Sequence, residues 1–139
     1  MVNIAINGFG RIGRLVFRIG FKEKNLSFVA INDLTDAKTL AHLLKHDSVH
    51  GTFDAKVESG EGFIKVDGKK ILVISEKDPT KLPWKKLDAG IVVESTGRFT
   101  KKEDLKHHLD CGAEKVLLSA PGKGGDVKTI VIGANEGHV

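Results

Sequence analysis

The feature that most constrains the fold of this chain is the glycine run Gly8-x-Gly10-x-x-Gly13. It follows an apolar segment, residues 2–7, that is typical of a β-strand, and it opens a helical pattern over residues 11–24. In this context the glycines allow a tight turn, close approach of a ligand to the backbone, and close helix packing. The free N–H groups at the helix start would then face a pyrophosphate.

The rest of the chain alternates apolar strands with amphipathic helices, which favours βαβ units and a mostly parallel sheet. Asp36 or Thr35 caps a second helix, and Thr100 with Glu103 forms a capping box for a third helix that ends near Cys111. Further strands are predicted at residues 27–32, 90–94, 115–119 and 129–133.

Residues 51–76 have a different character. Short strands are predicted at residues 52–57, 63–66 and 70–74, and the pair Asp67-Gly68 predicts a tight hairpin between the last two. We therefore expect one dinucleotide-binding domain over residues 1–139. Its fold class is α/β, a Rossmann-type mostly parallel sheet with helices on both faces and a small antiparallel insertion.

Asp33 ends the second predicted strand, twenty residues after Gly13. A carboxylate at this point accepts hydrogen bonds from the adenosine ribose hydroxyls of a dinucleotide. It would also repel a 2′-phosphate, and residues 34–37 contain no Arg or Lys to offset that repulsion. The predicted cofactor is therefore NAD rather than NADP.

Small polar residues follow two later strands. Ser95, Thr96 and Gly97 come after the strand GIVVE, and Ser119 ends the strand KVLLS. Because ligands of open parallel sheets bind beyond the carboxyl ends of the strands, this recurrence favours a ligand cleft there.

Composition argues against several other classes of protein. No apolar stretch approaches the roughly 20 residues that a membrane span needs. The single cysteine, Cys111, allows no intrachain disulfide and is typical of a reducing compartment, so we expect a cytoplasmic location. Its place at a predicted helix C-terminus, beside Gly112, is unfavourable for a thiolate nucleophile.

The charged and histidine residues do not form a convincing second site. The net charge of +4 is too dispersed to indicate nucleic-acid binding. The pairs His42/His46 and His46/His50 lack a partnered Glu or Cys, so no metal is expected. Residues 122–125 lack the Gly-Lys-Ser/Thr ending of a phosphate loop and are interpreted as a mobile surface loop.

Several segments together closely resemble a known family: NIAINGFGRIGR, VAINDL, HDSVHG, VVESTGRFT and VLLSAP. They resemble the N-terminal part of phosphorylating glyceraldehyde-3-phosphate dehydrogenase, and the likeness continues through IVIGAN near residue 139. The resemblance implies a glycolytic, cytoplasmic oxidoreductase, usually a homotetramer. Such an enzyme oxidises glyceraldehyde 3-phosphate with NAD and phosphate to 1,3-bisphosphoglycerate.

The resemblance also implies which residues contact NAD. Arg11 and Ile12 would lie at the pyrophosphate, Asn32 and Asp33 on the adenosine side, and Lys77 near the adenine, chiefly through its backbone. Ser119 would lie toward the nicotinamide. The complete implied set is Asn7, Gly8, Phe9, Gly10, Arg11, Ile12, Gly13, Asn32, Asp33, Lys77, Ser95, Thr96, Gly97, Phe99 and Ser119.

One part of the family pattern is missing. The catalytic cysteine of the family lies in a Ser-Cys-Thr-Thr-Asn motif, which these 139 residues do not contain, and Cys111 matches neither the motif nor its context. We therefore expect no catalytic residue and no activity from this chain alone. Two alternatives remain open: the NAD-binding portion of erythrose-4-phosphate dehydrogenase, and a non-catalytic module for nucleotide binding or interaction.

Overall fold

The computed structural model describes residues 1–120, 122, 127, 128 and 130. Most of the strand predicted at residues 129–133 and most of the loop predicted at 122–125 lie outside the described residues. No helix among the described residues is long and apolar enough to cross a membrane. The elements are β1 (Val2–Asn7), α1 (Arg11–Gly20), β2 (Leu26–Asn32), α2 (Ala37–Lys45), β3 (His46–Asp47), β4 (Gly51–Thr52), β5 (Val57–Gly60), β6 (Phe63–Val66), β7 (Lys69–Ile74), η1 (Pro79–Lys81), β8 (Ile91–Glu94), α3 (Lys102–Asp110) and β9 (Lys115–Leu118).

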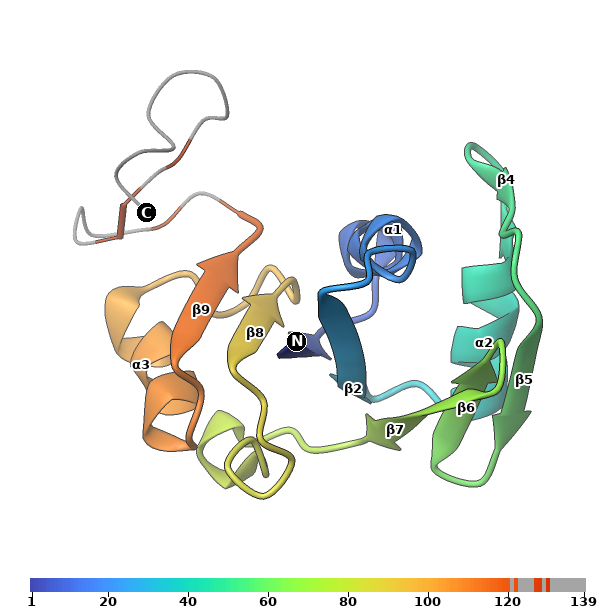
Figure 1. Cartoon of the computed structure of the whole chain (residues 1–139). Helices are drawn as coiled ribbons and strands as arrows, with labels where there is room; N and C mark the ends of the chain where they lie inside the picture. The colour runs from blue at the N-terminus through green and yellow to red at the C-terminus, as the bar shows by residue number, and fades with distance from the viewer. Residues whose placement is uncertain (121, 123–126, 129, 131–139) are drawn as a thin grey trace.

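Seven strands form one sheet in the order β5-β6-β7-β2-β1-β8-β9. Strands β7, β2, β1, β8 and β9 are parallel to one another. Strand β6 is antiparallel to both β5 and β7. Strands β3 and β4 form a separate antiparallel pair. The parallel part has the first five strands of the Rossmann order 3-2-1-4-5-6, so the predicted α/β fold with a small antiparallel insertion is confirmed. Figure 1 shows α2 beside the antiparallel strands and α3 beside β9.

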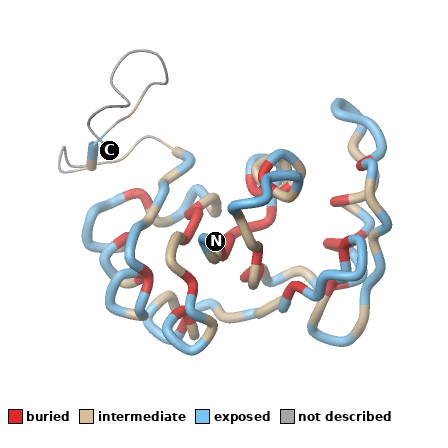
Figure 2. The backbone as a smooth tube through the Cα atoms, in the orientation of Figure 1, coloured by how far each residue is buried: buried red, intermediate tan, exposed pale blue. Residues whose placement is uncertain are grey.

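Successive side chains of the central strands point to opposite faces of the sheet, so the core consists of one buried cluster on each face. Ile4 and Ile6 of β1 belong to one buried cluster, which also includes Phe17 of α1. Ala5, between them in sequence, belongs to the second cluster, where it packs with Trp84. Figure 2 shows buried stretches in the central strands and also in the helices that pack against the sheet. Both faces are therefore covered, as parallel strands require.

Helix α1 buries Gly13, Phe17 and Gly20 on one side. The ring of Phe17 lies among other aromatic rings, with centroids 4.7 Å from Phe28 and 5.4 Å from Phe21. Residues 11–24 were predicted as helical, but α1 ends at Gly20. A Cβ at Gly20 would lie 2.8 Å from the ring of Phe28, so this end of the helix packs directly on β2 and the chain turns there.

Two other local predictions were wrong. No continuous strand spans residues 52–57, because Phe53 turns into the core and separates β4 from β5. The capping box of Thr100 and Glu103 does not form. The N-cap of α3 is Lys101, without a side-chain hydrogen bond, and Thr100 is buried instead. At α2, where two caps were possible, Asp36 is the N-cap and accepts a hydrogen bond from the backbone of Thr39.

Candidate functional site

A cleft of about 280 Å³ lies at the carboxyl ends of β1, β2 and β8. Strands β2 and β7 lie on one side of β1, and the later strands β8 and β9 lie on the other. Open α/β sheets bind ligands at the point where the strand order reverses in this way. The lining residues come from the glycine turn, the ends of β2 and β8, and the segment after β7. They are Asn7, Gly8, Gly10, Asn32, Asp33, Leu34, Glu76, Lys77, Pro79, Leu82, Ser95, Thr96, Arg98 and Phe99.

The three glycines of the turn have different surroundings. Gly8 has a φ of +93°, which favours glycine, and a Cβ there would lie 2.7 Å from the backbone nitrogen of Thr96. A Cβ on Gly13 would collide with the carbonyl oxygen of Gly8. At Gly10 a Cβ would meet no described atom within 4 Å. The first and third glycines therefore allow close packing, and the second leaves open space beside the cleft.

The N-terminus of α1 begins at this open space. Gly10 is the N-cap and supplies no side chain, and the first turn contains no acidic residue. The first N–H groups of a helix have no partner within the helix, and they carry the positive end of its dipole. The turn can therefore hold an anionic group, and the space at Gly10 fits a dinucleotide pyrophosphate.

Asp33 follows β2 directly, and two backbone N–H groups hold its carboxylate. Oδ2 accepts a hydrogen bond from the N–H of Phe9 at 2.8 Å, and Oδ1 accepts one from the N–H of Thr35 at 2.9 Å. A carboxylate has about four acceptor positions, so Asp33 retains capacity for ligand hydroxyls. The side chain thus connects the glycine turn to β2 and also places a negative charge in the cleft.

Ser95 supports the glycine turn from the neighbouring strand. Its hydroxyl donates to the carbonyl oxygen of Gly8 at 2.6 Å, and its backbone N–H donates to the carbonyl oxygen of Asn7 at 2.8 Å. The oxygen would also lie 3.0 Å from a Cβ on Gly13. Ser95 therefore stabilises the shape of the turn.

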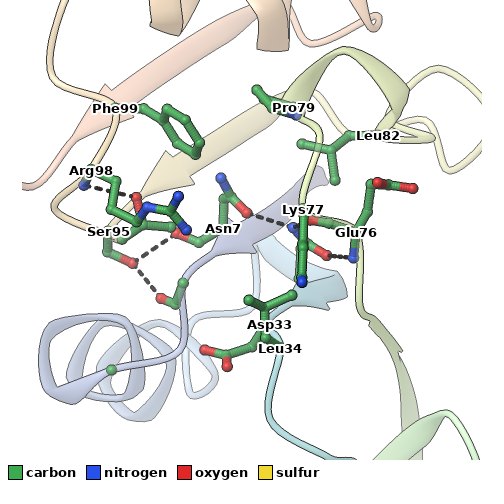
Figure 3. Close-up of a pocket in the computed structure, with 14 residues that line it drawn as sticks. Asn7, Asp33, Leu34, Glu76, Lys77, Pro79, Leu82, Ser95, Arg98 and Phe99 are labelled. Atoms are coloured by element: carbon green, nitrogen blue, oxygen red, sulfur yellow. Dashed lines mark hydrogen bonds between the residues drawn. The ribbon is translucent and has the colours of Figure 1, made fainter.

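The outer walls of the cleft combine apolar and charged side chains. Figure 3 shows Phe99 and Arg98 on one side, with Lys77 and Asp33 on the other. The guanidinium of Arg98 lies 5.7 Å from the ring centroid of Phe99, within the range of a cation–π contact. Leu82 supplies apolar surface from the segment after η1. Such walls suit a flat aromatic group attached to a charged chain.

The structure brings most of the predicted site residues to this cleft, but some lie beside it. Phe9 points into the core, and only its N–H faces Asp33. Arg11 and Ile12 are exposed in the first turn of α1, and Gly13 is buried beneath it. The other two predicted residues outside the lining, Gly97 and Ser119, are exposed beyond β8 and β9.

Sequence reasoning did not select five of the residues that line the cleft. Leu34, Glu76 and Arg98 are each adjacent in sequence to a selected residue, so their positions in the chain gave a signal for them. The remaining two, Pro79 and Leu82, belong to the segment between β7 and β8 and reach the cleft through a crossover that no local pattern predicts.

A buried carboxylate directly below the cleft was also not selected. Glu94, the last residue of β8, is 0% exposed. Burial raises the pKa of its carboxyl, but hydrogen bonds from His108, Thr96 and Asn7 outweigh this effect and hold the pKa below its ordinary value. Glu94 therefore carries a negative charge inside the protein.

Comparison with known proteins agrees with this geometry. Residues 2–102 match the family model described as the NAD binding domain of glyceraldehyde 3-phosphate dehydrogenase. Glyceraldehyde-3-phosphate dehydrogenase of Thermotoga maritima is 59% identical over 138 residues, which are 98% of this chain and 41% of the relative. The enzyme of Geobacillus stearothermophilus is 56% identical over 135 residues, 97% of this chain and 40% of the relative.

The match covers nearly all of this chain but only part of each relative. The chain spans about 40% of the length of the curated relatives it matches. The family model covers the glycine turn, Asp33 and the residues that follow β8. With a family model that matches most of its length and a cleft at the expected strand ends, this chain belongs to the NAD-binding domain family of glyceraldehyde-3-phosphate dehydrogenases.

Proposed function

We propose that the cleft binds NAD with its pyrophosphate beside Gly10 and its adenosine ribose on Asp33. The observation that carries this proposal is the hydrogen bond that joins Asp33 to the glycine turn at Phe9, because it connects the two segments that would make these contacts. Open space at Gly10 and the uncapped start of α1 supply room and N–H donors for the phosphates. Phe99 and Leu34 would flank the adenine.

We also propose that the cleft prefers NAD to NADP. The carboxylate of Asp33 would repel a 2′-phosphate, and it is held in place by two backbone N–H groups. Lys77 and Arg98 line the same cleft and are the candidates to offset that repulsion. Because its two hydrogen bonds fix the Asp33 carboxylate in the cleft, we expect its repulsion of a 2′-phosphate to dominate.

For the longer enzyme, we propose oxidation of glyceraldehyde 3-phosphate with NAD and phosphate to 1,3-bisphosphoglycerate. Bound NAD supplies the acceptor for the hydride. Residues 1–139 would act as one dinucleotide-binding domain that positions this acceptor. A cytoplasmic homotetramer is the proposed form of that enzyme, as the family resemblance implies.

Calorimetric titration of the purified chain tests the proposed cofactor site. We expect saturable NAD binding in the micromolar to low-millimolar range, weaker binding after Asp33→Ala, and weaker binding of NADP than of NAD. Asp54→Ala is the matched control, because Asp54 is an exposed carboxylate outside the cleft. Absence of saturable NAD binding by the folded wild-type chain would refute the proposal.

A further inference from the structure

Three neighbouring strands end with polar residues in one row. The sheet register pairs Asn32 with Asn7, and Asn7 with Glu94. All three residues are at least 95% buried. They lie on the same face as Ala5 and Val92, the face that Trp84 covers. Because the two asparagines line the cleft, this buried row forms part of its floor.

The carboxylate of Glu94 is surrounded by hydrogen-bond donors. Oε1 accepts from Nδ2 of Asn7 and Nε2 of His108, both at 2.7 Å. Oε2 accepts from the hydroxyl of Thr96 at 2.7 Å and from its backbone N–H at 3.0 Å. Four donors fill the four acceptor positions of an ionised carboxylate. The charge is thus stabilised by hydrogen bonds from groups whose orientation it also determines.

Trp84 determines the proton position on His108. The indole Nε1–H can only donate, and it lies 3.0 Å from Nδ1 of His108. Nδ1 must therefore accept, which leaves the ring proton on Nε2, where it points to Glu94. His108 is a neutral donor in this arrangement.

One branch of the network leads from Glu94 to the segment after β7. Because a carboxylate only accepts, Asn7 must turn its NH₂ group toward Glu94 and its oxygen toward Asn32. The NH₂ group of Asn32 donates to that oxygen at 2.8 Å and to the carbonyl oxygen of Glu76 at 2.9 Å. The Asn32 oxygen accepts the Glu76 N–H at 2.9 Å. The orientation of both amides thus follows from the charge on Glu94.

The other branch leads to the glycine turn. The hydroxyl of Thr96 donates to Glu94, and it accepts the N–H of Arg98 at 3.1 Å. Gly8 packs against the backbone and methyl group of Thr96 so closely that a Cβ would lie within 2.8 Å of each. Glu94 therefore fixes the position of Thr96, the residue on which the glycine turn packs at Gly8.

We propose that Glu94 is the positioning residue of the NAD cleft and acts through Asn7 and Thr96. His108 holds the carboxylate of Glu94 in its orientation through their hydrogen bond. The proposal rests on the proposed NAD site and adds residues that do not line the cleft. Glu94 touches neither the open space nor the proposed ligand; it sets the directions of the groups that do. The low pKa of Glu94 accords with a carboxylate that stays charged for this purpose.

A pair of substitutions at His108 separates positioning from simple packing. His108→Gln can place an NH₂ donor where Nε2 lies, keeping the bond to Glu94 and losing the one to Trp84. His108→Asn can place an acceptor where Nδ1 lies, keeping the bond to Trp84 and losing the one to Glu94. Each variant therefore loses one bond of the same buried ring.

We expect the asparagine variant to bind NAD about tenfold more weakly than wild type, and the glutamine variant to stay within about twofold. The side-chain amide NMR signals of Asn7 and Asn32 should move in the unliganded asparagine variant and remain in place in the glutamine variant. Affinities are compared at a temperature where circular dichroism shows every variant folded. Equal NAD affinity of the two variants, or equal amide shifts, would overturn the proposal.

Glu94→Gln provides a second test that does not depend on His108. A glutamine cannot accept from all four donors, so we expect weaker NAD binding and displaced Asn7 and Asn32 amide signals. Glu58→Gln, on the exposed strand β5, is the control and should change neither. If Glu94→Gln is unfolded, the His108 pair decides the question alone.

A wild-type chain that fails to bind NAD would refute the proposed function. The side-chain amide signals of Asn7 and Asn32 would still test whether Glu94 determines the orientation of these two residues.

Discussion

The N–H of Phe9 donates a hydrogen bond of 2.8 Å to the carboxylate of Asp33, joining the glycine turn after β1 to the end of β2. Phe9 also anchors the turn from below, because its buried ring lies edge-on to Phe17 at 5.9 Å between centroids. The proposed phosphate and ribose contacts are therefore rigidly connected before any ligand arrives. Such preorganisation lowers the entropic cost of binding.

Replacing Gly10 and Gly13 by alanine should have opposite consequences. Gly10→Ala should leave the free energy of unfolding nearly unchanged, because a Cβ there meets no described atom within 4 Å, but it should weaken NAD binding by occupying the space for the pyrophosphate. Gly13→Ala should destabilise the fold by about 1–3 kcal/mol, because its Cβ collides with the Gly8 carbonyl. Urea unfolding and calorimetric titration measure the two effects. Unimpaired NAD binding by Gly10→Ala would contradict the proposed pose.

Arg98→Gln should reduce NAD affinity several-fold and make it less sensitive to salt. The guanidinium lines the cleft beside Phe99 and is exposed, so its attraction for the cofactor phosphates is screened by added ions. Titrations at low and high sodium chloride concentration measure the difference. Lys65→Gln, an exposed charge on β6, serves as the control for net charge. The same salt dependence in both variants would count against a role for Arg98.

Acidification should destabilise the chain partly through Glu94. The pKa of Glu94 is lower in the folded state than its ordinary value of 4.5, so the unfolded state binds the proton more readily. Its stabilising contribution is present above that value and is lost as the pH falls through the folded pKa. Urea unfolding between about pH 3 and 7 should therefore give a steeper loss of stability in wild type than in Glu94→Gln.

Other carboxylates contribute with the same sign and remain in that variant. Hydrogen bonds lower the pKa of Asp36 through Thr39, of Asp47 through the backbone of His50, and of Asp78 through Thr80. A residual acid dependence in Glu94→Gln is therefore expected. Identical pH profiles of the two proteins would show that the Glu94 pKa does not differ between folded and unfolded states.

Removing the cap of α2 should affect stability without affecting the cleft. Asp36 accepts hydrogen bonds from the backbone and hydroxyl of Thr39 at 2.8 and 2.9 Å. Asp36→Ala should lower the free energy of unfolding by about 1 kcal/mol. Thermal unfolding measures this loss, and Asp36→Asn, which can still cap, should recover most of it. NAD affinity should stay at the wild-type value in both.

The 139-residue chain should not oxidise glyceraldehyde 3-phosphate. Aldehyde oxidation through a covalent intermediate needs an activated nucleophile beside the cofactor. The thiol of Cys111 lies 3.4 Å from the carbonyl oxygens of Pro79 and Thr80 and does not line the cleft. We expect no formation of NADH above background in the presence of substrate, NAD and phosphate. Turnover above background would contradict this expectation, and its loss in Cys111→Ser would assign the activity to that thiol.

Local sequence patterns were sufficient for the side of the cleft that the glycine turn and the end of β2 form. Strand β1, the glycine turn and the start of α1 follow from contiguous residues, and so does Asp33 at the end of β2. The errors occurred where tertiary contacts override local preference. Thr100 has the side chain of a good cap but is buried, and Phe53 interrupts a strand-like run because the core accepts its ring.

The network below the cleft was beyond reach for a different reason. Glu94 and Asn7 are 87 positions apart in sequence, and only the sheet register makes them neighbours. His108 contacts Glu94 from α3, the helix that connects β8 to β9. The sequence shows that Asn7 and Glu94 are polar residues at the ends of apolar strands. It does not show that they are partners, because this depends on the order of the strands in the sheet.

The burial of Glu94 also affects how the sheet assembles. Side chains alternate between the two faces of a strand, so a slip of β8 by one residue would move this carboxylate among the phenylalanine rings on the opposite face. A charge without donors in such surroundings is strongly destabilising. Glu94 thus penalises misaligned pairing of β8 with β1, so one ionised group contributes to the choice of strand alignment as well as to the shape of the cleft.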